Sequence, residues 1–294
     1  MTRALLDIQK LGKKYGKNII LKNISFSINK GEVVGLIGHN GVGKTTLMKC
    51  ILGTTGYDKG NRFFNGASIK NKECPQGIGA LIEQPGIYPF FTGMENIAVL
   101  NSTYSSTEID WLLDKFRMRL FMDRKVSSYS LGMRQKLGIV EAFLMGSKLV
   151  ILDEPINALD PESVEEFREA VKYFSEKGIS FLISSHIISE LSKITDKILI
   201  LNDTKLFGIN NKKKQEMLIT IGCHEIKDLK YFLEKKHIEY KLDNNYFVIN
   251  SDSCLKNGNY ITQIIKAGFD IKYLDLNKES IESKILKLMG DKDD

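Results

Sequence analysis

A glycine-rich segment near the N-terminus has the residue types and spacing of a phosphate-binding loop. It matches the pattern G-x-x-x-x-G-K-[ST] with the residues Gly38, His39, Asn40, Gly41, Val42, Gly43, Lys44 and Thr45. Thr46 follows with a second hydroxyl. Glycines let the backbone curl until its N–H groups face an anion, and a following helix adds the positive end of its dipole. In such a loop Lys44 reaches the β- and γ-phosphates, and the Thr45 hydroxyl binds Mg²⁺.

The sequence around this loop supplies the strand and the helix that the motif requires. Residues 33–37 are an apolar run that predicts a buried strand, and residues 47–52 predict a helix. A glycine-rich turn without a ligand has no need of both neighbours. We therefore expect the segment to bind a nucleotide.

Two carboxylates follow a second apolar run, at residues 149–152. An acid at the C-terminal end of such a strand can hold Mg²⁺ beside a phosphate loop, and its neighbour can polarise an attacking water. Taken alone, an Asp-Glu pair serves equally well as a helix cap or a turn. Because it lies downstream of the phosphate loop, we expect Asp153 to bind the metal and Glu154 to act in catalysis.

Composition and charge narrow the class of protein. The chain has 294 residues, enough for one large domain and a smaller one, and its net charge of +6 is spread along the sequence. No apolar run approaches the ~18 residues that span a bilayer, and Asp7 interrupts the only segment placed like a signal peptide. The four cysteines show no paired spacing, which favours a reducing cytoplasm.

The pattern of apolar runs predicts two parts. Buried runs at residues 33–37, 149–152, 180–184 and 198–201 alternate with helices, which indicates a parallel α/β sheet. Residues 5–10 and 19–28 are instead typical of antiparallel strands, and residues 108–122 and 130–145 of helices. We expect a nucleotide-binding domain over residues 1–207, with a helical insert at about 86–146.

The remaining residues, 208–294, predict a small α+β accessory domain that carries no chemical motif. Its expected elements are a strand at 217–222, a helix at 227–236, a hairpin at 240–249, a helix at 260–267, a strand at 271–276 and a helix at 281–289. The basic run Lys212, Lys213 and Lys214 is interpreted as a solvated linker between the two parts.

From residue 5 to residue 201 the chain resembles the ATP-binding subunit of an ABC transporter. Beside the phosphate loop and the acidic strand end, it has Asn157-Ala158-Leu159-Asp160 where that family has its D-loop, and Ser184-Ser185-His186 where it has its switch histidine. Tyr15 matches the aromatic residue that stacks on adenine, and residues 130–136 stand in place of the signature L-S-G-G-Q. The resemblance implies a P-loop NTPase fold with an antiparallel β subdomain and a helical insert.

The resemblance also implies roles for these residues. Tyr15 and Asp160 would contact nucleotide, and His186 would sense the γ-phosphate. Ser130, Gly132 and Met133 would face the γ-phosphate bound by a second subunit, so that two chains enclose two ATP molecules as a homodimer, or as a heterodimer with a paralogue. The implied ligands are ATP and Mg²⁺, and the implied partner is a transmembrane permease rather than nucleic acid. The implied location is the cytoplasmic face of the membrane.

The chain departs from the family pattern at two places. In the signature, Leu131 replaces a glycine and Met133 replaces the glutamine. At the Q-loop, counting back from Pro85 places the family's glutamine at Glu83, whereas a shift of one residue places it at Gln84, and both are candidate ligands of Mg²⁺. Both departures resemble the bacitracin-resistance and lantibiotic-immunity branch, which implies export of a peptide antibiotic.

Other interpretations of the motifs stay open. One is an ABC-type ATPase that is not coupled to transport, and another is an ABC exporter of a different substrate. A P-loop kinase or small GTPase would lack the signature helix and His186, and a kinase would phosphorylate an acceptor instead of releasing phosphate. A non-hydrolysing regulatory module would release no phosphate at all.

Overall fold

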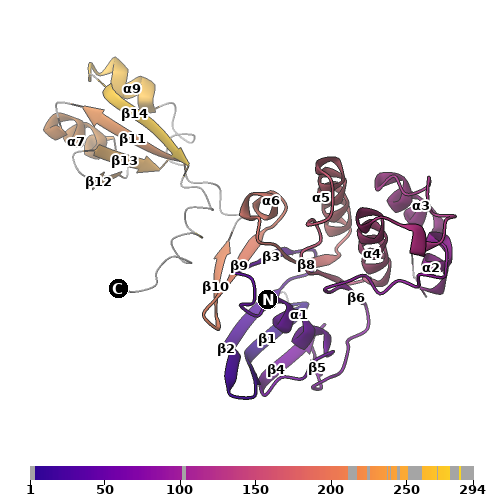
Figure 1. Cartoon of the computed structure of the whole chain (residues 1–294). Coiled ribbons are helices and arrows are strands. Elements are labelled where there is room, and N and C mark those ends of the chain that lie inside the picture. The colour runs from indigo at the N-terminus through magenta and orange to yellow at the C-terminus, as the bar shows by residue number, and fades with distance from the viewer. Residues whose placement is uncertain are drawn as a thin grey trace. The chain divides into compact units, whose positions relative to one another are not determined.

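A computed structural model gives the fold of the chain (Figure 1). It describes residues 4–100, 104–210, 217–223, 226–236, 238, 240–243, 246–250, 260–269, 271–278 and 285. Contacts between Cα atoms divide the chain into two compact units, Met1–Asn210 and Asn211–Asp294.

The first unit is built on a central sheet of six strands in the order β10-β9-β3-β8-β7-β6. Its strands are β10 (Lys205–Asn210), β9 (Lys197–Asn202), β3 (Val33–Ile37), β8 (Ser180–Ser184), β7 (Leu149–Leu152) and β6 (Ile78–Leu81). All pairs are parallel except β9 with β10. Every residue of β3, β7 and β8 is buried, as expected for parallel strands covered on both faces. The predicted parallel α/β sheet is confirmed.

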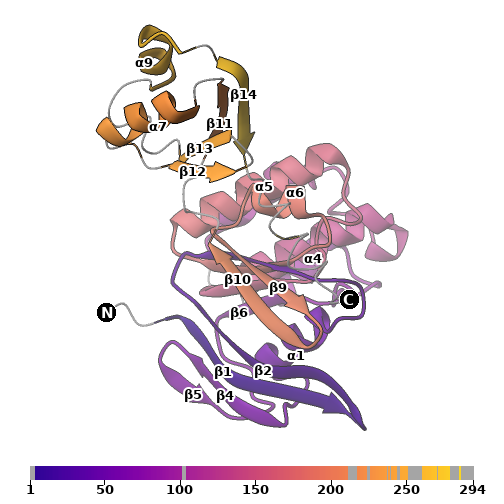
Figure 2. The ribbon, with the colours of Figure 1, turned by 90° about the vertical axis from the view of Figure 1, so that its left-hand side faces the viewer.

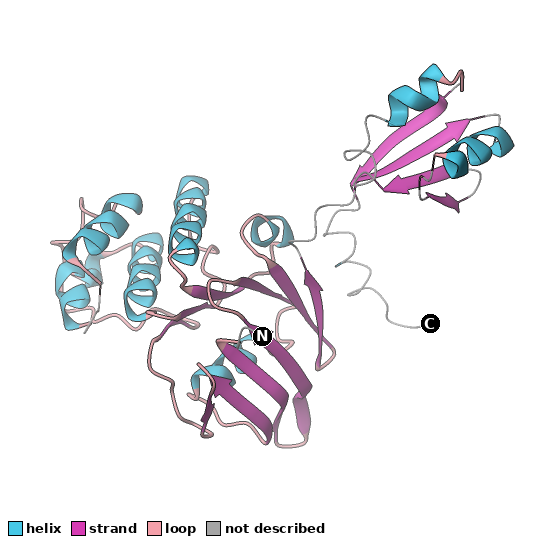
Figure 3. Cartoon of the chain, turned by 180° about the vertical axis from the view of Figure 1, so that it is seen from behind, coloured by secondary structure: helices cyan, strands magenta, loops and turns pink. Residues whose placement is uncertain are grey.

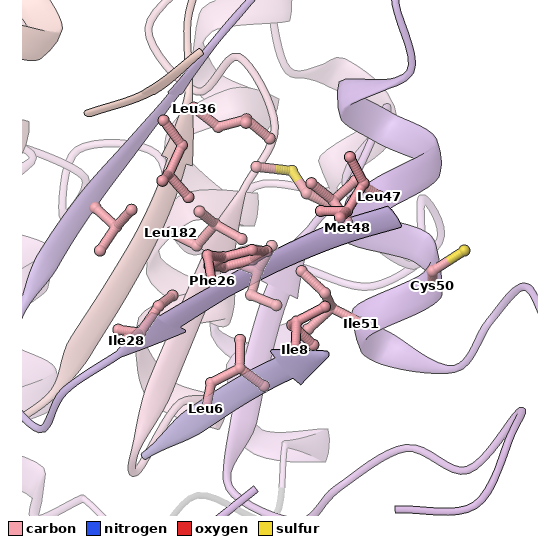
Figure 4. Packing of buried hydrophobic residues seen from close by; sticks show 14 of the residues in the cluster. Leu6, Ile8, Phe26, Ile28, Leu36, Leu47, Met48, Cys50, Ile51 and Leu182 are labelled. Carbon is pink, nitrogen blue, oxygen red and sulfur yellow. The ribbon is translucent and has the colours of Figure 1, made fainter. Parts of the chain in front are cut away.

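A second, antiparallel sheet packs below the first, with the helix that follows the phosphate loop between them (Figures 1 and 2). Its order is β2-β1-β4-β5, from β1 (Leu6–Tyr15), β2 (Asn18–Ile28), β4 (Lys59–Phe64) and β5 (Ala67–Ile69), and it confirms the predicted antiparallel subdomain. Figure 4 shows the packing of Leu6 and Ile8 from β1, Leu47 and Ile51 from α1 (Lys44–Leu52), and Leu36 and Leu182 from the central sheet. Each such buried side chain contributes about 1.5–3 kcal/mol, so α1 is held firmly between the sheets.

Helices cover the opposite face of the central sheet (Figures 1 and 3). On that face lie α4 (Leu131–Met145), α5 (Pro161–Glu176) and the short α6 (Ile188–Ser192). The helices α2 (Gly93–Val99) and α3 (Ser106–Lys115) lie outward from α4, and a 3-10 turn is at Val126–Ser128. Capping boxes begin two of them: Thr92 with Glu95 in α2, and Ser105 with Glu108 in α3. Phe143 of α4 and Phe174 of α5 pack edge to face, with their ring centroids 5.2 Å apart.

One predicted helix is shorter than expected. The pattern over residues 108–122 predicted a single helix, but α3 ends at Lys115. Arg117 has a φ of 52°, in the left-handed region that ends a right-handed helix. After Arg117 the chain forms an irregular turn, and Met118 and Met122 in this turn are buried. The helix-like spacing of apolar residues therefore extends beyond the end of the helix.

The second unit contains β11 (Met217–Cys223), α7 (Ile226–Lys235), β12 (Tyr240–Asp243), β13 (Tyr246–Asn250), α9 (Tyr260–Lys266) and β14 (Ile271–Lys278). Among the residues described in this unit, the strand pairs are antiparallel, in the order β12-β13-β11-β14. This βαββαβ order is the ferredoxin-like split arrangement, around a small core that includes Leu229, Leu233 and Phe247. The basic run at 212–214 lies outside the described residues, as does the predicted helix at 281–289 except for Ile285.

Within the part of the chain that the structure describes, no helix has the length and apolar character needed to cross a membrane.

Candidate nucleotide-binding and hydrolysis site

The phosphate loop joins the end of β3 to the start of α1. Gly43 is the residue before the helix and has a φ of 111°, a conformation that side chains other than glycine rarely adopt. At Gly38 a Cβ atom would lie 2.6 Å from the carbonyl oxygen of Leu201, so a side chain there would collide with the end of β9. Both glycines are therefore required by the shape of the loop. His39 and Asn40 are exposed at its tip, and Thr46 is half-buried in the first turn of α1.

Lys44 is folded back over this loop. Its Nζ donates hydrogen bonds to the carbonyl oxygens of Gly38, at 2.8 Å, and His39, at 3.4 Å. It also lies 3.4 Å from Oε1 of Glu154 at the end of β7. The side chain is buried, so its charge acts in surroundings that screen it less than water does.

Asp153 is hydrogen-bonded to three elements of the first unit, two through its carboxylate and one through its backbone. Its Oδ2 accepts a hydrogen bond of 2.6 Å from the hydroxyl of Thr45, on α1. Its Oδ1 accepts one of the same length from the hydroxyl of Ser184, the last residue of β8. The backbone N–H of Asp153 donates to Leu81 at the end of β6. These contacts fix the carboxylate beside the first turn of α1.

Glu154 lies between a lysine and a histidine. Its Oε2 is 2.9 Å from Nδ1 of His186 and accepts a longer bond of 3.3 Å from the backbone N–H of the same residue. Its Oε1 faces Lys44 and accepts no hydrogen bond within the described part of the chain. The φ of Glu154 is 49°, an uncommon value for a residue with a side chain, and such values gather at functional sites. A carboxylate placed in this way can accept a proton or orient a water.

Ser184 was named from the sequence only as part of the segment that ends in His186, with no role in the site. Its hydroxyl donates to Asp153 and accepts a bond of 2.9 Å from the backbone N–H of Glu154, so it positions both carboxylates. The available signal was its place at the end of a buried strand. Because β7 and β8 are parallel neighbours, with Leu152 opposite Ile183, the residues that follow them meet at one edge of the sheet.

At the Q-loop the structure brings Glu83 to the phosphate-loop helix. The Nζ of Lys49, on α1, lies 2.7 Å from Oε1 of Glu83. The φ of Glu83 is 61°, so the backbone turns sharply there. The N–H of Gln84 donates back to the carbonyl of Ile82 at 2.7 Å. Glu83 is thus in contact with α1 through an ion pair.

The signature residues lie apart from the phosphate loop of the same chain. Ser130 precedes α4, and its hydroxyl accepts a bond of 3.3 Å from the N–H of Met133. Figures 1 and 2 place α4 and α1 on opposite faces of the central sheet. At Gly132 a Cβ would lie 3.1 Å from the carbonyl of Ala158, so the glycine allows the signature to approach the D-loop closely. Gln135 adds a hydrogen bond of 2.9 Å to the carbonyl of Pro155, a contact that the sequence did not suggest.

Asp160 and Tyr15 also lie outside the cluster around Asp153. Asp160 caps α5, and its carboxylate accepts a hydrogen bond from the backbone N–H of Ser163. This hydrogen bond holds the pKa of the Asp160 carboxyl below its ordinary value. Tyr15 ends β1 in the antiparallel sheet, half exposed, with Nζ of Lys13 4.7 Å from its ring centre. Its exposed ring is accessible for stacking.

Comparison with protein families gives two matches. The model described as ABC transporter matches residues 21–157, which include the phosphate loop, the signature and the acidic strand end. A second model, described as AAA domain, putative AbiEii toxin, Type IV TA system, matches residues 123–192.

Named relatives extend this match. The chain is 38% identical over 204 residues to the lantibiotic transport ATP-binding protein SrtF of Streptococcus pyogenes, covering 69% of this chain and 89% of that one. It is 28% identical over 308 residues to the bacitracin transport ATP-binding protein BcrA of Bacillus licheniformis, covering 98% of each. The second alignment therefore spans both units of the chain.

Solved structures agree with the sequence relatives. The ATP-binding subunit of an ABC transporter is 29% identical, with a TM-score of 0.64 over 70% of this chain and 90% of that one. A dimeric bacterial ABC transporter cassette, 22% identical, shares the fold with a TM-score of 0.63 over 70% of this chain and 99% of that one. The predicted P-loop NTPase fold is confirmed, and the chain belongs to the family of ABC transporter ATP-binding proteins, which hydrolyse ATP.

Proposed function

We propose that this ATP-binding subunit hydrolyses ATP where the phosphate loop meets the ends of β7 and β8, and that it drives a separate permease that exports a peptide antibiotic. The observation that carries the hydrolytic part is the position of Glu154. Its carboxylate lies 3.4 Å from Lys44 and 2.9 Å from His186, beside the phosphate loop.

The donor set at the start of α1 suits Mg²⁺. Magnesium prefers hard oxygen ligands, and the Thr45 hydroxyl and the Asp153 carboxylate supply them side by side, 2.6 Å apart. These two residues would hold the ion, with Glu83 or Gln84 after β6 as further candidates. When bound, Mg²⁺ neutralises charge on the phosphates during phosphoryl transfer.

The protein's own groups divide the remaining work. Lys44 and the backbone N–H groups of the loop bind the β- and γ-phosphates. Oε1 of Glu154, buried and without a hydrogen bond in the described residues, takes a proton from the attacking water or orients it. His186 donates a hydrogen bond to the transferring phosphoryl group. The imidazole of His186 is held in place by its contact with Oε2 of Glu154. Tyr15 stacks on the adenine.

The second half of each site comes from another chain. Ser130, Gly132 and Met133 are at the N-terminus of α4, a helix of 15 residues whose first N–H groups and dipole favour an anion. Since α4 and α1 lie on opposite faces of the sheet, these residues act on ATP bound by a second subunit (Figure 2). The fold shared with a dimeric cassette supports this arrangement.

The permease contact lies on the helical insert. Large apolar side chains are exposed there, namely Tyr88, Phe90, Met94 and Leu120, and the exposed fractions of Phe90 and Leu120 are 81% and 92%. Large apolar side chains that are exposed on one part of a protein are typical of interaction surfaces. The insert follows Glu83, so movement of the Q-loop would reach this surface directly.

The cargo is inferred from the relatives. SrtF and BcrA are named for lantibiotic and bacitracin transport, and the alignment with BcrA includes the second unit. We assign the second unit as an accessory domain of this bacitracin-type subunit. The proposed cargo is therefore a membrane-active peptide antibiotic.

Two measurements test the proposal. The purified full-length protein should release inorganic phosphate from MgATP, and absence of release would overturn the ATPase assignment. Cells that express the chain with its partner permease should need more bacitracin or lantibiotic for growth inhibition than cells that express the Glu154→Gln variant with the same permease. Phosphate release with unchanged resistance to both classes would overturn the cargo and favour another substrate, or an ATPase not coupled to transport.

A further inference from the structure

The ion pair between Lys49 and Glu83 connects two segments of the nucleotide site that are 34 residues apart. Nζ of Lys49 and Oε1 of Glu83 are 2.7 Å apart, a short charge-assisted hydrogen bond. The Glu83 side chain is 62% exposed, so the pair can open without disturbing the core. Lys49 belongs to the same helix as Lys44 and Thr45.

The pair places Glu83 one helical turn from the expected metal position. Thr45 and Lys49 are four residues apart on α1, which puts them on the same face and ~6 Å apart along the helix axis. The strand that precedes Glu83 is tied to the same place, because the N–H of Asp153 donates to the carbonyl of Leu81. A change in the short segment after Leu81 would therefore move the Glu83 carboxylate relative to Thr45 and Asp153.

The backbone at Glu83 supports such a movement. Its φ of 61° lies in the left-handed region, which costs free energy for a residue with a side chain, so a change of backbone conformation there would relieve that cost. The segment that follows leads to the exposed apolar residues of the helical insert. A displacement of Glu83 would thus displace the start of that surface.

We propose that Lys49 is a positioning residue that competes with Mg²⁺ for the carboxylate of Glu83. While the ion pair is made, Glu83 is held away from Thr45 and Asp153. On binding of MgATP, Glu83 would leave Lys49 and join Thr45 and Asp153 in holding the ion, and the Q-loop would move with it. This inference rests on the proposed metal site, and it assigns the Q-loop role to Glu83 rather than Gln84.

Competition predicts a specific effect on Mg²⁺ binding. Removing the Lys49 charge frees Glu83, so the Mg²⁺ concentration for half-maximal nucleotide binding should fall. Partly exposed ion pairs are weak, so the expected change is about two- to fivefold. Lys49→Met also removes a positive charge near the phosphates, an effect that does not depend on Glu83. Measuring the effect of Lys49→Met in a variant that lacks the Glu83 carboxylate separates the release of Glu83 from the loss of charge near the phosphates.

The experiment titrates Mg²⁺ into the full-length protein with a fluorescent, non-hydrolysable ATP analogue, for the wild type, Lys49→Met, Glu83→Gln and the double variant. We expect Lys49→Met to lower the half-saturating Mg²⁺ concentration, Glu83→Gln to raise it, and the shift caused by Lys49→Met to be smaller in the Glu83→Gln background than in the wild type. Lys49→Arg should retain the wild-type value. Lys177→Met is the matched control, because Lys177 makes a 2.9 Å pair with Glu108 away from the phosphate loop.

The outcomes separate this inference from the proposed function. Equal Mg²⁺ dependence in wild type and Lys49→Met, with normal analogue binding in both, would overturn the competition and leave the ATPase assignment intact. An equal shift with and without Glu83 would overturn it too, since Lys49 would then act on the phosphates alone. If the wild type bound no nucleotide at any Mg²⁺ concentration, the proposed function itself would fail.

Discussion

The hydroxyl of Ser184 donates a 2.6 Å hydrogen bond to Oδ1 of Asp153, whose other carboxylate oxygen accepts an equally short bond from Thr45. Ser184 also accepts the backbone N–H of Glu154. We expect Ser184→Ala to release Asp153 from one side, leave that N–H without its partner, and lower steady-state ATPase activity ~10-fold, the scale seen when partners of metal ligands are removed. The required Mg²⁺ concentration should rise as well.

A control for this prediction lies in the same strand. Ser180 is equally buried at the other end of β8, where its hydroxyl bonds to Asn29 and Gly31. Ser180→Ala should lower the melting temperature by a similar amount without changing the Mg²⁺ dependence. Equal effects of the two substitutions on that dependence would mean that Ser184 only stabilises the strand.

The position of Glu154 predicts a separation of binding from hydrolysis. Glu154→Gln keeps the size of the side chain and removes the base, so turnover should fall by ~10²-fold or more while ATP affinity stays close to wild type. Steady-state phosphate release and calorimetry measure the two quantities. Glu162→Gln, at an exposed carboxylate on α5, is the control. Near-normal turnover in Glu154→Gln would refute its assignment as the catalytic base.

Substitution of Lys44 should affect ATP binding itself, in contrast to substitution of Glu154. Its Nζ is held over the loop by the Gly38 and His39 carbonyls, and it provides the charge nearest to Glu154. Lys44→Ala should abolish ATP binding, because the phosphates lose their main positive partner. Calorimetry of this variant beside Lys22→Ala, an exposed lysine of β2, tests it. Unchanged affinity in Lys44→Ala would contradict the phosphate-loop interpretation.

The sequence predicted the parts of the site that are contained in local motifs. The strand before Gly38, the helix after the phosphate loop and the acidic end of β7 each have a pattern of a few consecutive residues, and the structure has all of them, although α1 begins at Lys44, before the predicted start at residue 47. The contacts of Ser184 and Lys49 depend on which strand or helix lies beside another, and one sequence does not state this. The early end of α3 depends on the backbone at Arg117, where the apolar pattern continued through a turn.

Glu141, on α4, predicts how stability depends on pH. Its side chain is buried, and burial raises the pKa of its carboxyl from 4.5 to about 7. Between these values the folded protein holds a proton that the unfolded chain releases, so the contribution of Glu141 to stability is present below pH 4.5 and is lost as the pH rises through 7. Above pH 7 the folded state must bury a charge, at a cost of up to about 3 kcal/mol.

Glu141→Gln removes this cost, because a neutral amide does not ionise. The variant should therefore have a higher Tm than the wild type at pH 8, and the difference should shrink toward zero by pH 5. Thermal unfolding across this range measures it, with Glu176→Gln, at an exposed carboxylate near the end of α5, as the control that shows no such trend. A Tm difference that stays constant from pH 5 to pH 8 would show that Glu141 is ionised in the folded protein throughout, which would mean that a charged or polar group near it compensates for its burial.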